Sequence, residues 1–532
     1  MTRPHVFVAM ADILNLKCDA WLLPTDSAVR IEQHWLRANP ALREIAAASA
    51  SKDFRAGTVL AEPLAPWEPA DPLPVLTAVP LDGIWDSTAV ARRLEAFVRA
   101  ATSATSSPAL RPCRLLAVPF FGTAGGGAGN HLGAMLRGLL DVCANLASKF
   151  DVDLVIVLRD KSAFSLAQKL RRDGGGAGCW PSLGGELHAK AQMLGDLARS
   201  GHLVPFLGAG VSVSAGAPTW RDLLATLRAG VQLEEGAAAA FDKLAVLDQA
   251  GVLEQLYVDQ HGSRAAFGEV VAKAVDLQKY GLAPALLAAV PSSGAITLNY
   301  DRLFELACHD AQRPRTVLPE NIPAVGNSWL LKLHGSVSQP ESIVLTRDDY
   351  LGYNSNREAL SALVKAHLLT HHLLFVGFGL ADDHFHEIVH DVRRALPEGT
   401  SKGHHMGTVL SLFHEPLQSM VWKGKLDILS MPAEPDADKL SDAQSNVALA
   451  TAGRELEIFL DMMASYATDN HSYLLAPAYD AGMNHAEAKL RTQLLRLAEQ
   501  QRPPGTEEVW ALLDKTLERL GHPGSNNKKR ES

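Results

Sequence analysis

LVPFLGAGVSVSAGAPTWR, residues 203–221, is the stretch that decides the fold of the central part of this chain. Its pattern predicts a buried strand, a glycine turn and the opening of a helix. Gly208 and Gly210 allow close approach of a backbone, and Ser212 and the free N–H groups after it can meet a pyrophosphate at a helix N-terminus. Tight strand-to-helix turns use the same residues for steric reasons alone, so a dinucleotide site and simple close packing both stay open.

Three further apolar runs also end in polar or small residues. The residues that follow the expected strands 295–298, 329–333 and 373–376 are Asn299-Tyr300-Asp301, His334-Gly335 and Gly377-Phe378-Gly379. In an open parallel α/β sheet, ligands bind beyond the carboxyl ends of the strands. We therefore expect these residues to meet in one crevice. The apolar spacing over 234–280 predicts a helical insertion, and residues 343–345 are expected to be strand-like.

Length and composition set the limits for the whole chain. The 532 residues predict several domains, and 47% hydrophobic with 20% charged residues is typical of a soluble globular protein. A formal net charge of −9 without a basic stripe argues against direct nucleic-acid binding. The five cysteines form no C-x-x-C pair, and no apolar run reaches the length of a membrane-spanning helix. These features predict a cytoplasmic protein with no membrane association.

The N-terminal region alternates strand and helix patterns up to about residue 165, which predicts an α/β domain. Short strands are expected at 6–10, 20–23, 57–60, 75–79, 115–119 and 152–158, and helices at 88–104 and after His131. Two loops stand out, Ala11-Asp12-Ile13 and the glycine-rich run at 121–129 between a strand and a helix.

These two loops, with Cys18-Asp19-Ala20, resemble a macro domain. The resemblance implies that Asp12 contacts adenine and that Gly125, Gly126 and Gly127 hold the diphosphate of an ADP-ribose-type ligand. Thr25 or Asp26 stands where that family has Asn, which places hydrolase activity in doubt more than binding. The alternative is that the glycine run serves close packing alone.

The ordered motifs of the central region resemble the sirtuin family, which implies a Rossmann-type parallel sheet and NAD as the ligand. By that resemblance His334 is the catalytic base, Asn299 orients the ribose or the attacking water, and Arg221 and Asp301 lie by the nicotinamide ribose. The remaining residues implied to contact NAD are Gly208, Ala209, Gly210, Ser212, Gly377 and Gly379. A base for this chemistry is expected to titrate near neutral pH. The alternative for His334 is a strand-end histidine bonded to a backbone carbonyl.

Departures from the deacylase pattern point to a different reaction. The four zinc-binding cysteines of deacylases are absent between Gly335 and Gly377, and Leu298, Thr219 and Gly379 replace polar residues of that pattern. The chain thus resembles the sirtuin-like NADases of bacterial antiphage defence, in which water takes the place of the acyl group. NAD is expected as a substrate, and no zinc is expected.

The histidines His384, His386 and His390 leave a metal site open, but spacing fixes no third ligand, and a solvated or interface helix face is favoured. Asp382 is expected to be a helix N-cap rather than a general acid.

Together these observations predict four segments. They are a macro-like nucleotide-binding or sensing domain at 1–165, a glycine-rich linker at 166–186, a sirtuin-like NAD-hydrolysing domain at 187–470, and a helical extension with a disordered tail at 471–532. We expect an NAD glycohydrolase that forms a homo-oligomer and acts as an abortive-infection effector. An ADP-ribose-type signal, a protein partner or a phage trigger would activate it. The alternatives are an NAD-dependent protein deacylase or ADP-ribosyltransferase, and a non-catalytic NAD or ADP-ribose sensor scaffold.

Overall fold

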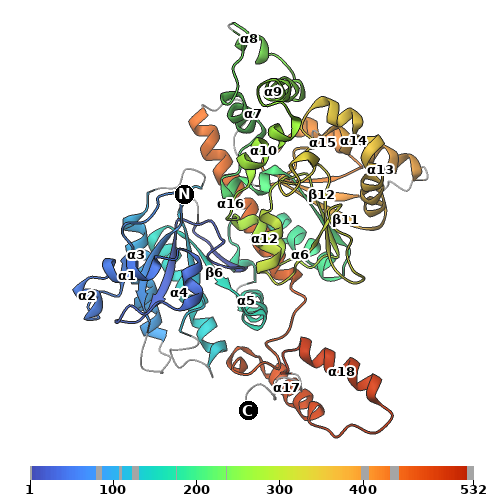
Figure 1. Ribbon diagram of the computed structural model, residues 1–532. Coiled ribbons are helices and arrows are strands. Elements are labelled where there is room, and N and C mark those ends of the chain that lie inside the picture. Colours follow the sequence, from blue (N-terminus) through green and yellow to red (C-terminus); the bar gives the residue numbers. More distant parts are fainter. Residues whose placement is uncertain are drawn as a thin grey trace. The chain divides into compact units, whose positions relative to one another are not determined.

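The computed structural model describes residues 3–79, 87–106, 111–122, 131–174, 176–234, 236–380, 382–396, 406–431 and 442–523 (Figure 1). The chain divides into two compact units. The first combines Met1–Gln192 with Ile458–Ser532, and the second is Met193–Glu457. Residues after 458 therefore belong with the N-terminal α/β region, whereas the sequence leads us to expect a separate extension from 471. Gly125, Gly126, Gly127 and the tail from 524 lie outside the described residues.

The second unit is built on a seven-stranded sheet in which every pair of neighbouring strands is parallel. The strand order is β13-β12-β11-β7-β8-β10-β9. The strands are β7 Leu203–Leu207, β8 Gly294–Thr297, β9 Thr316–Leu318, β10 Trp329–Lys332, β11 His372–Val376, β12 Gly407–Ser411 and β13 Asp427–Ser430. Strand β7 lies between β8 and β11, and the later strands extend outward from each of these. The carboxyl end of β7 is therefore the topological switch point, where open α/β sheets bind ligands.

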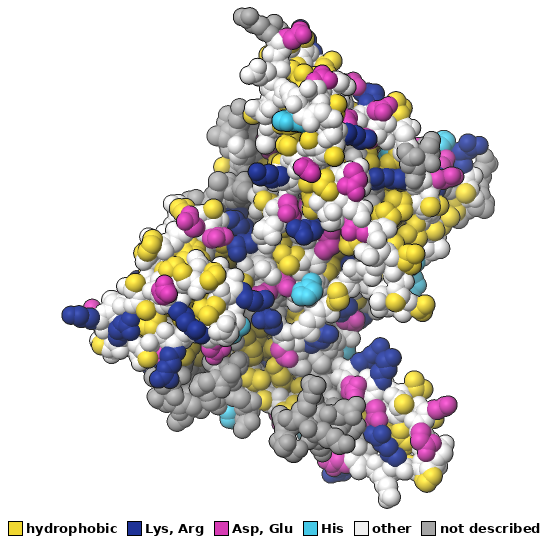
Figure 2. Space-filling model, in the orientation of Figure 1, with side chains coloured by type: hydrophobic (Ala, Val, Ile, Leu, Met, Phe, Trp, Pro, Cys, Tyr) yellow, Lys and Arg dark blue, Asp and Glu magenta, His cyan; other side chains and the backbone are white. Residues whose placement is uncertain are grey.

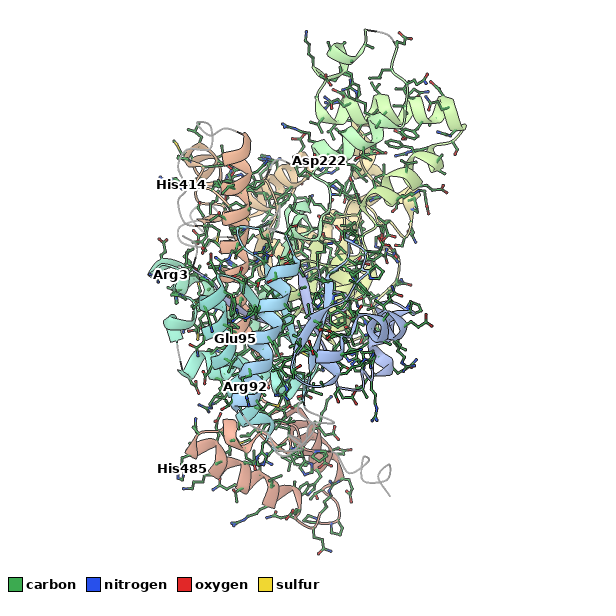
Figure 3. The ribbon with its side chains drawn as sticks, turned by 90° about the vertical axis from the view of Figure 1, so that its left-hand side faces the viewer. Arg3, Arg92, Glu95, Asp222, His414 and His485 are labelled. Atoms are coloured by element: carbon green, nitrogen blue, oxygen red, sulfur yellow. The ribbon has the colours of Figure 1, made fainter. Side chains whose placement is uncertain are left out.

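Helices complete this unit, and the expected helical insertion is confirmed. The helices are α7 Trp220–Ala229, α8 Ala238–Phe241, α9 Val246–His261, α10 Arg264–Val275, α11 Leu282–Ala288, α12 Leu303–Asp310, α13 Arg347–Thr370, α14 Asp383–Ala395 and α15 Pro416–Trp422. Helices α7 to α10 share a core of their own, which includes Leu227, Leu253 and Val271. Thr219 caps α7 through a reciprocal pair with Asp222, which is labelled in Figure 3.

One prediction for this unit is wrong, and one strand was not predicted. Residues 343–345 form no strand, because Ile343 and Leu345 pack into the core of the helical insertion and Val344 into the core of the sheet. The edge strand β9 is not anticipated from the sequence. It is three residues long and only half-buried, and so gives no apolar run.

The first unit has a mixed six-stranded sheet of order β1-β6-β5-β2-β4-β3, in which only the β3–β4 pair is antiparallel. The strands are β1 Val6–Met10, β2 Ala20–Thr25, β3 Ala61–Pro63, β4 Leu73–Ala78, β5 Leu115–Pro119 and β6 Asp153–Leu158. The main covering helices are α3 Ser87–Ala104, α4 Leu132–Phe150 and α5 Lys161–Gly174. The predicted α/β character is confirmed, while the strand expected at 57–60 lies at 61–63.

Helix α5 occupies much of the segment that the sequence analysis assigns to a linker. Its Arg171 is buried and forms a bidentate ion pair with Asp461, from the part of α16 (Asp442–Ala467) that belongs to this unit. His5 Nε2 (2.9 Å) and Trp180 Nε1 (2.8 Å) also bond to Asp461 Oδ2. A partner 290 residues away fixes this segment, so the glycines after Asp173 do not make it a free linker.

The C-terminal residues of the first unit form α17 His485–Ala498 and α18 Glu507–Arg519, in agreement with the helical character predicted for 471–532. A small apolar cluster that includes Leu475, Leu517 and Leu520 joins them to the preceding segment. On the face drawn in Figure 2, Lys and Arg side chains are interspersed with Asp and Glu side chains. No helix within the described ranges is both long and apolar enough to cross a membrane.

Candidate active site

A cavity of about 560 Å³ lies beyond the carboxyl ends of β7, β8, β10 and β11. Its volume is within the usual range for small-molecule sites. The expectation of one crevice is met, because residues from every predicted motif line this cavity. The predicted residues among them are Gly208, Ala209, Ser212, Asn299, Asp301, His334, Gly377 and Gly379. Gly210 and Arg221 are not among the lining residues. Arg221 is exposed, whereas its neighbours Trp220 and Leu223 line the cavity.

The glycine turn after β7 packs against the turn after β11. Gly208 N donates to Val376 O at 2.9 Å, and Gly210 N donates to Gly377 O at 3.0 Å. A Cβ on Gly208 would lie 2.4 Å from Gly377 O, and one on Gly210 would lie 2.8 Å from Gly377 Cα. Close packing therefore accounts for these glycines. Both N–H groups are used within the protein. Ser212 is engaged as well, because its N–H donates to Ala209 O at 3.0 Å and its hydroxyl donates to Asp301 Oδ2 at 2.9 Å, so the predicted diphosphate contact rests on Ala209.

This packing predicts that alanine lowers the stability of the protein at one glycine of the site and leaves it unchanged at another. Gly208→Ala is expected to lower the free energy of unfolding by about 1–3 kcal/mol, because the added methyl group meets backbone atoms that cannot move independently. Gly379→Ala should leave stability nearly unchanged, since nothing lies within 4 Å of the new methyl group. Urea titration of both variants measures the difference. Equal stabilities would contradict the contact between the two turns.

Asn299 is held by its amide nitrogen. Nδ2 donates to Gly208 O at 3.1 Å and to Ser212 Oγ at 3.3 Å, and because a backbone carbonyl only accepts, the amide orientation is fixed. The amide oxygen Oδ1 is buried and has no hydrogen-bond partner. An unsatisfied buried acceptor costs about 1–3 kcal/mol. Asn299 lines the cavity, and a hydroxyl group of a bound ligand could supply the donor that Oδ1 lacks.

Asp301 supports Asn299 through Ser212. Its Oδ2 accepts from Ser212 Oγ at 2.9 Å and its Oδ1 from Leu303 N at 2.9 Å. Burial raises the pKa of Asp301, and these bonds together with nearby Lys332 oppose that rise. Both carboxylate oxygens have partners within the protein, so Asp301 acts here as a positioning residue.

Lys332 is a site residue that sequence reasoning missed. It is 1% exposed at the end of β10, and Nζ donates to Asp301 O and to Glu305 Oε1, each at 2.6 Å. Burial raises the pKa of Glu305, with Lys332 opposing. The available signal was a lysine within the apolar run Trp329–Leu333, because a buried lysine needs a charged partner.

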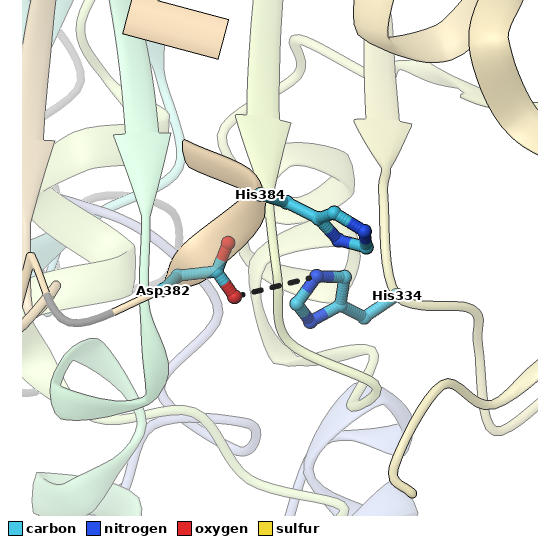
Figure 4. A group of neighbouring side chains, drawn as sticks. All are labelled: His334, Asp382 and His384. Carbon is cyan, nitrogen blue, oxygen red and sulfur yellow. Dashed lines mark ion pairs between the residues drawn. The ribbon is translucent and has the colours of Figure 1, made fainter. Parts of the chain in front are cut away.

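His334 follows β10 and is 4% exposed. The partner recorded for its side chain within the described residues is Asp382, with Nε2 3.6 Å from Oδ2 (Figure 4). Burial lowers the pKa of His334 to about 4, although Asp382 opposes that shift. The imidazole is therefore neutral at pH 7 and does not titrate near neutrality, which corrects the expectation. In the neutral ring one of the two nitrogens keeps a lone pair, and this nitrogen can accept a proton.

Asp382, which faces His334, has further hydrogen-bond partners that the sequence motifs do not include. Asp382 is the N-cap of α14, as predicted, and its Oδ1 accepts from Phe385 N at 2.9 Å. Its Oδ2 also accepts from Tyr350 Oη at 3.0 Å. Tyr350 comes from α13 and lines the cavity. No sequence motif marks Tyr350, because its role depends on the packing of α13 against α14.

The first unit has a cavity of about 700 Å³ of its own, beyond the carboxyl ends of β1, β2, β5 and β6. Asp12, Thr25 and Asp26 line it, together with Arg30 and Arg159. Asp12 is buried and already engaged, because its carboxylate accepts from Leu14 N and forms an ion pair with Arg37.

Comparison with known proteins finds a family match within the second unit. Residues 293–424 match the model of the SIR2-like domain, in agreement with the all-parallel sheet and the motifs at its strand ends. The chain is also similar to the Defense-associated sirtuin 2 of Bacillus subtilis. These two proteins are 31% identical over 39% of this chain and 21% of that relative.

Two proteins named NAD(+) hydrolase ThsA are similar as well. The one from Enterococcus faecium is 29% identical over 38% of this chain and 42% of its own length. The one from Bacillus cereus is 27% identical over 36% of this chain and 40% of its own length. The chain therefore spans well under half the length of each of these three relatives. The similarity covers a domain and not a whole protein.

Proposed function

We propose that the second unit hydrolyses NAD+ to nicotinamide and ADP-ribose. The observation that carries the proposal is the unpartnered, buried Oδ1 of Asn299 in a cavity that also holds the neutral imidazole of His334. The similarity to two NAD(+) hydrolases and the match to a SIR2-like domain supply the substrate class.

The reaction breaks the bond between C1′ of the ribose and the nicotinamide nitrogen. The electron pair leaves with nicotinamide, water forms the new C1′–O bond, and one proton is released. Asn299 Oδ1 would accept a hydrogen bond from a ribose hydroxyl group or from the attacking water. His334 would accept the proton that is released, as a general base, and would then pass it to solvent. Asp382, 3.6 Å from His334, would stabilise the imidazolium that forms. Asn299 is neutral and adds no second charge beside the base.

A protein deacylase is the alternative that uses the same site. It is disfavoured because no cysteine lies between Gly335 and Gly377, where the resemblance requires four for the zinc module of deacylases. The cavity is also lined by Leu298, Trp220 and Leu223 from this unit. Water remains the simplest acceptor for the ribose.

We further propose that the first unit is a macro-like sensor that binds an ADP-ribose-type nucleotide. Its cavity lies at the carboxyl ends of four parallel strands and is lined by Arg30 and Arg159. Both guanidinium groups pair with carboxylates of the same cavity, Arg30 with Asp26 and Arg159 with Asp12, so a bound phosphate would exchange with these ion pairs. Asp12 is paired with Arg37, so the adenine contact that the macro-domain resemblance implies would require this ion pair to open. Activation of a homo-oligomeric antiphage effector by such a signal, a protein partner or a phage trigger is part of this proposal.

The test is to incubate the purified full chain with NAD+ and quantify nicotinamide and ADP-ribose by chromatography. Equal amounts of both products without any acylated peptide are expected. If nicotinamide release requires an acetylated peptide and yields O-acetyl-ADP-ribose, the protein is instead a deacylase. A parallel series with ADP-ribose isomers tests the sensor, since binding or a change in turnover is expected. Retained NAD+ binding without turnover under every activator would leave only the non-catalytic scaffold.

A further inference from the structure

Three potential metal ligands from two elements lie beside one another, and two of them, His334 and Asp382, line the cavity. They are His334 after β10, Asp382 at the N-cap of α14, and His384 in the first turn of α14 (Figure 4). One ligand atom from each lies within 4.8 Å of the other two. The spacing of histidines along α14 could not reveal this group, because only His384 of that series takes part.

His384 is oriented as metal-binding histidines usually are. Its Nε2 lies 3.1 Å from Tyr350 O, and since a carbonyl only accepts, Nε2 carries the proton. Nδ1 therefore bears the lone pair, and it is buried without a hydrogen-bond partner. The ring is 9% exposed and packs against Tyr350 and Tyr353, with centroids 4.9 and 3.9 Å away. A second nitrogen bonded to a backbone carbonyl is the arrangement that fixes the tautomer of a metal ligand.

The side chains of Asp382 and His334 are also held in place by their neighbours. Asp382 is anchored through Oδ1 to Phe385 N, so its carboxylate stays at this position. His334 faces Asp382, and Tyr350 Oη donates to Asp382 Oδ2 and orients it from the other side. Two imidazoles and one carboxylate are a ligand set for Zn²⁺, and three protein ligands leave a fourth position for water.

The distances require a small adjustment on binding. Zn–N and Zn–O bonds of about 2.0–2.2 Å place tetrahedral ligands roughly 3.4 Å apart. Metal binding would therefore shorten the present separations between the ligand atoms, which lie within 4.8 Å of one another.

We propose that His334, Asp382 and His384 form a Zn²⁺ site whose occupancy inhibits the enzyme. The metal would take the lone pair of His334 that the proposed reaction needs, and it would place a dication near the positively charged nicotinamide ring of the proposed substrate. The inhibitory part rests on the proposed NAD+ hydrolysis, whereas metal binding by these three residues does not.

Binding is measured first, on the full chain freed of metal by chelator and dialysis. Calorimetric titration with Zn²⁺ is expected to show one site, and Co²⁺ in its place should give visible absorption bands. His384→Ala should weaken this site by more than the 10–100-fold that loss of an outer-shell group costs. Asp382→Asn should weaken it too and keep the fold, because Asn is as good an N-cap as Asp. The matched control is His390→Ala, an exposed histidine on the same helix.

Inhibition is measured next, as the ratio of NAD+ turnover with and without Zn²⁺ within each variant. Wild-type and His390→Ala proteins should be inhibited and recover with chelator, while His384→Ala should show a ratio near one. Zn²⁺ affinity that is equal in His384→Ala, Asp382→Asn and wild type would overturn the site. Turnover that Zn²⁺ leaves unchanged at saturation would overturn the inhibitory role. If no variant turns over NAD+, the proposed function fails, and the calorimetry still decides the metal site.

Discussion

Asn299→Ala is expected to lower kcat for NAD+ hydrolysis by about 10²- to 10³-fold, the usual cost of removing one preorganised hydrogen-bonding group from an active site. The alanine takes away the unpartnered Oδ1 and also releases Ser212 and Gly208 O from the amide nitrogen. His334→Ala is expected to cost about 10²- to 10⁴-fold, the range for loss of a general base. Nicotinamide release under saturating NAD+ measures both.

The matched control is Asn327→Ala, which removes an exposed asparagine from the same unit and should keep full activity. Thermal unfolding of each variant shows whether the fold is retained. A folded Asn299→Ala protein with the kcat of wild type would exclude Asn299 from the reaction. A folded His334→Ala protein with unchanged kcat would restore the alternative in which this histidine only ends a strand.

Asp461→Asn is expected to lower the free energy of unfolding of the first unit by about 3–5 kcal/mol, the cost of leaving a buried charge without its partner. Asp461 is fully buried and is the counter-charge of Arg171, and its oxygens also bond to His5 and Trp180. Urea unfolding followed by circular dichroism and by the fluorescence of all nine tryptophans measures the loss. Asp151→Asn is the control, because Asp151 is exposed and left-handed, a conformation that Asn adopts equally well.

The same carboxylate predicts an acid sensitivity. Burial alone would raise the pKa of Asp461, but the ion pair with Arg171 and the bond from His5 outweigh burial and hold the pKa well below its usual value. The charged form is thus favoured by folding, so its contribution is present above the unfolded pKa of about 3.9 and is lost as pH falls below it. The stability gap between wild type and Asp461→Asn should therefore narrow below about pH 4. A gap that is constant down to pH 2 would contradict this assignment.

The sequence was sufficient to predict most strands of both sheets and the residues that meet at the ends of β7, β8, β10 and β11. Apolar runs that stop at glycine or at polar residues are local signals, and the order of four such stops defined the crevice. Pairings between distant segments were out of reach. Lys332 with Glu305, and Arg171 with Asp461, each pair a charge with a partner that local pattern does not reveal.

The glycine turn shows a subtler limit. The motif at 208–212 correctly indicated where the site lies, yet its N–H groups at 208 and 210 bond to the β11 turn. The same residue pattern is typical of close packing and of nucleotide binding. Only the position of the β11 turn shows that Gly208 and Gly210 serve close packing. His334 lines the cavity as expected, and its role as a base stays a prediction. The burial that lowers its pKa depends on Tyr350, Tyr353 and His384, which pack around it.

The contact between Gly208, Gly210 and Gly377 also limits how this chain can change over time. Each of these glycines lies against the backbone of the other turn, and Gly377 has φ of +64°, a conformation that side chains disfavour. A methyl group added at one of these positions would clash with backbone atoms. A smaller side chain at another position could not remove that clash. The three positions should therefore tolerate no stepwise exchange, so that among variants selected for folding they remain glycine together while the neighbouring Gly379 is free to vary.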